Sequence, residues 1–281
     1  MSTITAQSVK SLRDRTGAGM MDCKKALLEV DGDEEMAIDL LRKWGAAKAA
    51  TRAERETREG MVCVASGDAG LGMVAVSSET DFVARNEEFQ DFSARLATAV
   101  ASSDLPDGEA MDGERLLNRE AFASFAAELT DLRTKIGENI SVYRAVRLQP
   151  SEGSSTASYV HFGGRIGVLV ELSGAGGHED AARDVAMHVA AANPVGVSPD
   201  DIPAGERERE RQVLTEQAKL EGKPEAIVEK IVEGRMRKFY EQSSLLLQAF
   251  VKDSDVSVEQ MLSREAEGLT VRRFVRFQIG E

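Results

Sequence analysis

Hydrophobic residues near the start of the chain recur three and four positions apart, which is the spacing of amphipathic helices. A first helix is expected between Thr5, which can cap its start, and Gly17, which can end it. A second is expected from about 20 to 30, and a third ends before Gly45. Together they predict a compact three-helix module of the ubiquitin-associated shape over residues 1–45.

The next segment differs in composition. Residues 46–59 are rich in Ala, Arg and Glu and have almost no apolar face. This pattern is typical of a helix surrounded by solvent, since a helix packed in a core needs an apolar stripe. We therefore expect residues 46–59 to form a helical linker that tethers the N-terminal module to the rest of the chain.

After the linker the hydrophobic period changes to two, which indicates strands. Two alternating runs flank the turn residues 67–70 and predict a hairpin. Helical spacing follows twice, and a third alternating run closes the series. In chain order the predicted strand, strand, helix, helix and strand are residues 61–66, 71–77, 89–100, 122–132 and 140–148.

The same order of elements recurs in the second half of the chain, which indicates an internal repeat. The predicted strands, helix and closing strand are residues 159–162, 165–172, 181–192 and 275–279. Residues 71–74 (LGMV) align with residues 166–169 (IGVL). We therefore predict an α+β fold with two related subdomains, 60–148 and 149–281, whose sheets pack side by side.

The second subdomain contains an insertion at about 203–240 that the first lacks. It consists of two charged helical stretches around Gly222-Lys223-Pro224, with a narrow apolar stripe of Ile227, Val228, Ile231, Val232 and Met236. Proline suits the start of a helix, so the stretches predict an antiparallel helical hairpin that protrudes from the body. A hairpin with a polar outer surface is a common handle for a partner.

Charge, apolar content and cysteine count then narrow the range of possible partners, locations and cofactors. A formal charge of −13 argues against direct nucleic-acid binding, which depends on Lys and Arg. No run approaches the roughly 20 apolar residues of a membrane span, and no targeting peptide precedes the first helix, so a cytoplasmic protein without a membrane partner is expected. Cys23 and Cys63 are too few for a disulfide framework or a zinc site, and no cofactor or metal is expected.

Candidate chemistry is sparse. A catalytic protein would need a converging nucleophile, base or metal cluster, and the sequence offers none with recognisable spacing. His161, beside a glycine turn, is by residue type a structural histidine. Met20 and Met21 suit either a core or an adaptable partner surface. A second possible class of function, besides catalysis, is an adaptor that binds unrelated helices through the N-terminal module.

The junction after the second strand carries the residues Thr80, Asp81 and Phe82. By residue type alone, Thr80 or Asp81 would cap the following helix and Phe82 would pack locally against it.

Several long motifs change that interpretation. They are SLRDRTGAGMMDCKKAL, SSETDFVARNEEF, KIGENI, HFGGRIGVLVEL, MHVAAANP, GKPEAIVEKIVEGRMRKF and the final FVRFQIGE. Together they cover nearly the whole chain, and the sequence thereby resembles the elongation factor Ts family of bacteria.

The resemblance implies a partner, elongation factor Tu, bound in its GDP-bound and nucleotide-free states, and a guanine nucleotide exchange role in translation without enzymatic chemistry. In the family an Asp-Phe pair enters the partner near its bound Mg²⁺ and phosphates. The implied binding residues are Thr80, Asp81, Phe82 and Val83, with secondary contacts from Leu12, Met20, Met21, Ile136, Gly137 and His161. Some relatives form two-plus-two assemblies with the partner and others do not, so the stoichiometry stays open.

Overall fold

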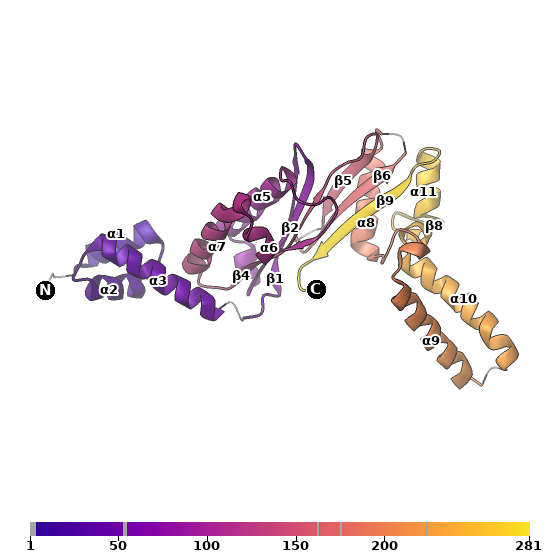
Figure 1. Cartoon of the computed structure of the whole chain (residues 1–281), viewed down its shortest axis with the longest axis horizontal. Coiled ribbons are helices and arrows are strands. Elements are labelled where there is room, and N and C mark those ends of the chain that lie inside the picture. The colour runs from indigo at the N-terminus through magenta and orange to yellow at the C-terminus, as the bar shows by residue number, and fades with distance from the viewer. Residues whose placement is uncertain (1–3, 53–54, 162, 175, 223) are drawn as a thin grey trace.

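The structure, a computed structural model, describes residues 4–52, 55–161, 163–174, 176–222 and 224–281. It has a mixed α and β composition with small antiparallel sheets. The molecule is elongated: three helices lie at one end, two sheets occupy the middle, and a pair of helices projects near the other end (Figure 1). Within the described residues, no helix has the length and apolar content needed to cross a bilayer.

The N-terminal helices are α1 (Ala6–Thr16), α2 (Met20–Glu29) and α3 (Glu34–Arg52). Thr5 caps α1 through its side chain and Gly17 ends it with φ of +67°, as predicted. The predicted end of the third helix before Gly45 is wrong, because α3 continues to Arg52. The Ala-rich segment that follows has high helix propensity, which outweighs the cost of about 1 kcal/mol for one internal glycine.

The predicted linker is therefore only partly helical. Residues 46–52 continue α3 without a break, whereas residues 55–58 are not helical and a strand begins at Glu59. The three helices enclose their own small core, and its buried members are Val9, Leu12, Ala18, Cys23, Ala26, Leu27, Ala37 and Leu41.

The first sheet has the strand order β1-β2-β4-β3, with antiparallel pairing throughout. Its strands are β1 (Glu59–Gly67), β2 (Gly70–Ser78), β3 (Met111–Asp112) and β4 (Ile140–Leu148). Its helices are α4 (Asp81–Ala84), α5 (Glu87–Ala101), α6 (Gly113–Leu117), the 3-10 helix η1 (Glu120–Phe122) and α7 (Ala123–Ile136). Phe89, Phe92 and Leu96 of α5 are fully buried in the core beneath this sheet, as their spacing predicts.

The second sheet has the order β5-β6-β9. A separate two-stranded sheet, β7-β8, comes between β6 and β9 in sequence. The strands are β5 (Ser155–Val160), β6 (Ile166–Ser173), β7 (Ala249–Phe250), β8 (Asp253–Ser257) and β9 (Thr270–Gln278). The helices of this half are α8 (Glu179–Ala192), η2 (Pro199–Asp201), η3 (Leu245–Leu247) and α11 (Val258–Glu265). The sequence had not indicated β3, β7, β8 or α11.

The projecting helices are α9 (Ala204–Leu220) and α10 (Glu225–Ser243), which lie side by side (Figure 1). They share a narrow apolar seam formed by Leu214, Ala218, Val228, Val232 and Met236. Most of the apolar stripe seen in the sequence therefore lies in the seam between the two helices, whereas Ile227 is exposed.

The two larger sheets repeat the same arrangement. In each, a hairpin is followed by a third strand that pairs with the second strand, and the third strand has one extra residue, a β-bulge. The bulge follows the pair Ala75–Arg144 in the first sheet and the pair Glu171–Arg273 in the second. The predicted order of elements is thus confirmed.

The predicted alignment of residues 71–74 with residues 166–169, however, is wrong by one residue. Val74 faces α5, whereas its aligned counterpart Leu169 faces the other sheet. Matching the two bulges instead pairs Met73 with Leu169 and Val74 with Val170, and these pairs do face equivalent sides. A slip of one position reverses the face of every residue in a strand, so similarity of residue type misled the alignment.

The two sheets pack against each other through a shared apolar layer. This layer joins Val62, Met73, Ala75, Val146 and Leu148 of the first sheet to Leu169, Phe277 and Ile279 of the second half. The backbone N–H of Val62 also donates to the carbonyl oxygen of Gly164 at 2.7 Å. The hairpin loop of the second half is thereby attached to the start of β1.

Candidate partner-binding site

The single turn α4, directly after β2, presents one large apolar side chain to solvent. Phe82 is 79% exposed, whereas the neighbouring Val83 is buried in the core beneath the first sheet. The interpretation of Phe82 as a locally packed residue is therefore wrong. Because Val83 anchors the turn, Phe82 stands out from the surface on a fixed base.

Thr80 occupies the N-cap position of α4, yet its side chain does not cap the helix. Its hydroxyl donates instead to Glu138 Oε1 at 2.8 Å, and its backbone N–H donates to Glu138 Oε2 at 3.1 Å. Asp81 forms an ion pair with Arg85 one turn later, at 3.0 Å. The turn is thus held by a residue from a distant part of the chain.

Glu138 belongs to the loop between α7 and β4. Ile136, the last residue of α7, is partly buried against the core of the first sheet. Gly137 ends the helix with φ of +85°, a left-handed conformation that glycine adopts without strain. Ile136 and Gly137 therefore lie in the segment that contacts the turn bearing Phe82.

In the N-terminal helices, Met20 and Met21 are 49% and 74% exposed, so they are not core residues. Cys23, Ala26 and Leu27 supply the buried face of α2 instead. Leu12, by contrast, is fully buried in the three-helix core. Its side chain offers no surface to a partner, and its predicted contact role is not supported by the geometry.

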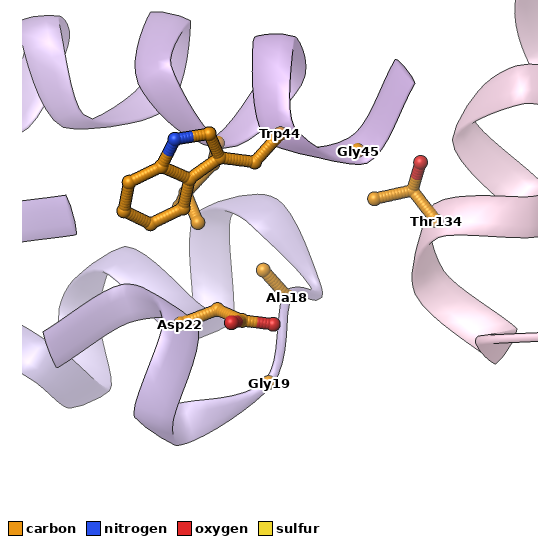
Figure 2. A pocket seen from close by; sticks show the side chains of 7 residues that line it. Ala18, Gly19, Asp22, Trp44, Gly45 and Thr134 are labelled. Carbon is orange, nitrogen blue, oxygen red and sulfur yellow. The ribbon is translucent and has the colours of Figure 1, made fainter. Parts of the chain in front are cut away.

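The N-terminal helices meet α7 at two glycines (Figure 1). The aliphatic part of Lys135 lies against Gly17, and a Cβ atom added at Gly17 would be 3.1 Å from it. Figure 2 shows Thr134 of α7 facing Gly45 of α3, where an added Cβ atom would lie 2.8 Å from the threonine. Gly45 therefore permits close packing in the middle of a helix.

A small cavity lies at this junction, lined by Ala18, Gly19, Asp22, Leu41, Trp44, Gly45 and Thr134 (Figure 2). Its volume of about 40 Å³ is far below the roughly 300 Å³ at which pockets accommodate small-molecule ligands. A larger, open hollow of about 940 Å³ adjoins it between the N-terminal helices and the helices α5 and α7, and Arg15, Glu88 and Lys135 are among the residues that line it. The N-terminal helices therefore touch α7 at the two glycines and leave this hollow beside the contact.

His161 lies just after β5, in the hairpin loop, and it is exposed. Its Nδ1 is 3.1 Å from the hydroxyl of Tyr159. The histidine that satisfies a structural role is instead His188, which is buried between Gln248 at 2.9 Å and the backbone N–H of Val251 at 3.1 Å. Burial lowers the pKa of His188, so its imidazole is neutral at physiological pH.

The remaining candidates for chemistry are metal-binding clusters and the two thiols. Among the residues that the structure describes, no group of three or more His, Cys, Asp or Glu is placed to hold a metal. Both thiols are buried, and burial raises the pKa of Cys63 to about 11, which keeps it protonated at neutral pH.

An exposed aromatic side chain on an anchored turn, with further exposed methionines, is the kind of surface through which proteins bind other macromolecules. The family model described as "Elongation factor TS" matches residues 79–281. The chain belongs to this family of translation elongation factors, which implies nucleotide exchange on elongation factor Tu. The match begins at Glu79 and includes the turn that bears Phe82, whereas Leu12, Met20 and Met21 precede it.

Proposed function

We propose that this protein binds GDP-bound elongation factor Tu, releases GDP by inserting Asp81 and Phe82 beside the partner's Mg²⁺ and phosphate site, and leaves a nucleotide-free complex that GTP can enter. The observation that carries the proposal is the 79% exposure of Phe82 on a turn anchored by Val83 and bound to Glu138. The place of action is the cytoplasm, and no covalent bond is made or broken.

The residue types suit this mechanism. Burying a Phe side chain contributes about 1.5–3 kcal/mol, which is enough to hold two partner helices apart. Phosphate sites depend on backbone N–H groups, a Lys and Mg²⁺ in fixed positions. Because many contacts share that geometry, a displacement of about an ångström weakens them together, and GDP leaves.

Thermodynamic linkage then makes exchange reversible. If this protein lowers the affinity of the partner for nucleotide, bound nucleotide lowers the affinity of the partner for this protein by the same factor. An incoming nucleotide therefore displaces the factor from the nucleotide-free complex. The direction of exchange follows from the relative concentrations of GDP and GTP.

The other parts of the molecule would extend the contact. We assign the ubiquitin-associated-like module (1–45) and the first subdomain (60–148) to the partner's nucleotide-binding domain, and the second subdomain (149–281) to another domain. The helical hairpin at about 203–240 is an accessory arm. Met20, Met21, Ile136, Gly137 and His161 are secondary contacts; all five are at least partly exposed. The same surfaces allow either a one-to-one complex or a two-plus-two assembly.

The test is the release of a fluorescent GDP analogue from elongation factor Tu. Phe82→Ala should reduce the acceleration by about 10- to 100-fold, since the burial of one Phe side chain is lost. Its stability should stay within about 0.5 kcal/mol of the wild type, because an exposed side chain makes few contacts in the free protein.

Val251→Ala provides the matched control, since Val251 is 54% exposed but lies between β7 and β8, apart from the residues named as contacts. It should leave the acceleration of GDP release near the wild-type value. Equal acceleration by the wild type and Phe82→Ala would remove Phe82 from the mechanism, and no acceleration by the wild type would refute the proposed function.

A further inference from the structure

Two carboxylates fasten the segment before α4 to the segment before β4. Beyond the end of the β2–β4 ladder, Glu138 accepts hydrogen bonds from the N–H and the hydroxyl of Thr80, at 3.1 and 2.8 Å. In the opposite direction, Glu79 accepts the backbone N–H of Asn139 at 2.6 Å. Each segment therefore satisfies a backbone donor of the other. We call these four residues, Glu79, Thr80, Glu138 and Asn139, the carboxylate clasp.

The clasp fixes one end of the turn that carries Phe82. A helical turn as short as α4 is not stable in isolation, because ordering its backbone loses more free energy than its few hydrogen bonds contribute. Val83 holds the turn from below, in the core. Thr80, two residues before Phe82, is held through the clasp and through the hydrogen bond from the Ser78 hydroxyl to its carbonyl. The direction of Phe82 thus depends on Glu138.

The backbone before Glu138 has a matching specialisation. Gly137 has φ of +85°, and a Cβ atom added there would meet nothing within 4 Å. Space does not require a glycine at this position, so the conformation does. The left-handed residue turns the chain out of α7, and Glu138 follows directly.

We propose that Glu138 is a positioning residue for nucleotide exchange, which acts through Thr80 by holding the Phe82 turn in the arrangement that enters the partner. This inference rests on the proposed function. A turn that is already ordered pays no ordering entropy when it inserts, whereas a loose turn pays it in every complex. Loss of Glu138 therefore lowers the fraction of complexes in which Phe82 is inserted.

The kinetic signature separates positioning from affinity. Glu138→Ala should lower the saturating rate of GDP release by about 5- to 20-fold, since each charge-assisted bond to Thr80 is lost. The half-saturating concentration of the factor should change less than about twofold, because the other contact surfaces are unaltered. Thr80→Val, which keeps the backbone donor but loses the hydroxyl, should fall between the wild type and Glu138→Ala. Thr80→Ser, which keeps both donors, should retain more of the saturating rate than Thr80→Val.

A double-mutant cycle tests whether Glu138 acts through Thr80. If it does, Glu138→Ala has a smaller effect in the Thr80→Val background than in the wild type. Additive effects would mean that Glu138 contacts the partner itself, and they would overturn the inference. Glu128→Ala is the matched control, since Glu128 is a glutamate of the neighbouring helix α7 that pairs with Arg95 and not with a member of the clasp.

A reporter in the free protein supplies a second readout. Trp44 is the single tryptophan of the chain, so Trp44→Phe with Phe82→Trp places one fluorophore on the turn. Adding Glu138→Ala should lower its fluorescence anisotropy, because the turn gains local motion. Adding Glu128→Ala should not.

The outcomes distinguish this inference from the function on which it rests. If the wild type accelerates GDP release and Phe82→Ala does not, the proposed function stands. An unchanged saturating rate and an unchanged anisotropy in Glu138→Ala would then overturn the positioning role alone. If the wild type gives no acceleration, both proposals fail together.

Discussion

The two larger sheets share one scaffold, and one pair of equivalent positions shows how they differ. Directly before the bulge, the first sheet pairs Ala75 with Arg144, and the second pairs Glu171 with Arg273. Ala75 and Glu171 are both fully buried, and both stand on the faces where the two sheets meet. The first sheet thus places a methyl group where the second places a charge.

The buried carboxylate of Glu171 pairs with Arg273, which also binds two other groups. Arg273 Nε donates to Glu171 at 2.6 Å, its Nη1 to Asp107 at 2.8 Å, and its Nη2 to the carbonyl oxygen of Gln149 at 2.8 Å. Burial opposes ionisation of Glu171, but hydrogen bonds from Ser151 and Arg273 outweigh it and lower the pKa. The second sheet therefore fastens itself to the loops of the first half by an ionic network.

The difference teaches that the repeated unit serves two tasks. In the first half, the end of β2 leads into the exposed turn that bears Phe82. In the second half, β6 contributes Glu171 to the junction, and glycines with positive φ, Gly174 and Gly177, lead to α8. One copy presents the proposed binding surface, and the other attaches to the loops of the first by its ionic network.

The largest effect is expected from removing the arginine of the second pair. Arg273→Ala leaves Glu171 as an unpaired buried charge, which should destabilise the protein by about 3–5 kcal/mol. Arg144→Ala at the equivalent position is the control and should cost no more than about 0.5 kcal/mol, since Arg144 is exposed. Urea denaturation measures both. Equal losses of stability would show that the arginines at the two bulge positions contribute equally to the free energy of unfolding.

A smaller effect tests the corrected alignment. Gly72 is equivalent to Val168, yet a Cβ atom at Gly72 would lie 2.5 Å from backbone atoms of Ala97 and Ala101 in α5. Gly72→Ala should therefore cost about 1–3 kcal/mol through overpacking. The control is Gly234→Ala within α10, where an added Cβ atom meets nothing. It should stabilise by about 0.5–1 kcal/mol. A neutral Gly72→Ala would contradict the close approach of α5.

The smallest effect is the pH dependence of the network. Burial opposes ionisation of Asp107, but bonds from Arg273 and the Gln149 N–H lower its pKa, as happens at Glu171. A lowered folded-state pKa gives stability that is present above the unfolded value of about 4 and is lost as the pH falls through the folded value. The gap in urea midpoint between the wild type and Asp107→Asn should narrow from pH 7 to pH 3. A constant gap would exclude ionic pairing.

Sequence reasoning found the elements whose evidence is local. The alternating runs of β1 and β2, the spacing of Phe89, Phe92 and Leu96, and the caps of α1 are each visible within a few residues. Elements that depend on a distant partner were missed, such as β3, which pairs for only two residues with β4. Period alone also cannot fix the register of a repeat, which is why the alignment slipped by one residue.

In the candidate site, too, local sequence patterns predict some features and miss those that depend on distant contacts. Residue types at the end of β2 suggested a capped helix with a packed Phe82, and only the resemblance to the family marked Phe82 as a binding residue. Exposure could not be read from the local pattern, because a single aromatic residue in a short turn has no periodicity. The bond between Thr80 and Glu138 joins residues 58 positions apart, so no local signal could have predicted it.

The strand order has a consequence for how the chain folds during synthesis. Every strand of the first sheet lies between residues 59 and 148, so this sheet can form as soon as Leu148 is available. The second sheet needs β9, whose Phe277 pairs with Gly167, and β9 is translated only after α9, α10 and α11. Until β9 is synthesised, the edge of β6 that later pairs with it has no partner strand. During that time the apolar face of the first sheet is the surface against which the β5–β6 hairpin can pack.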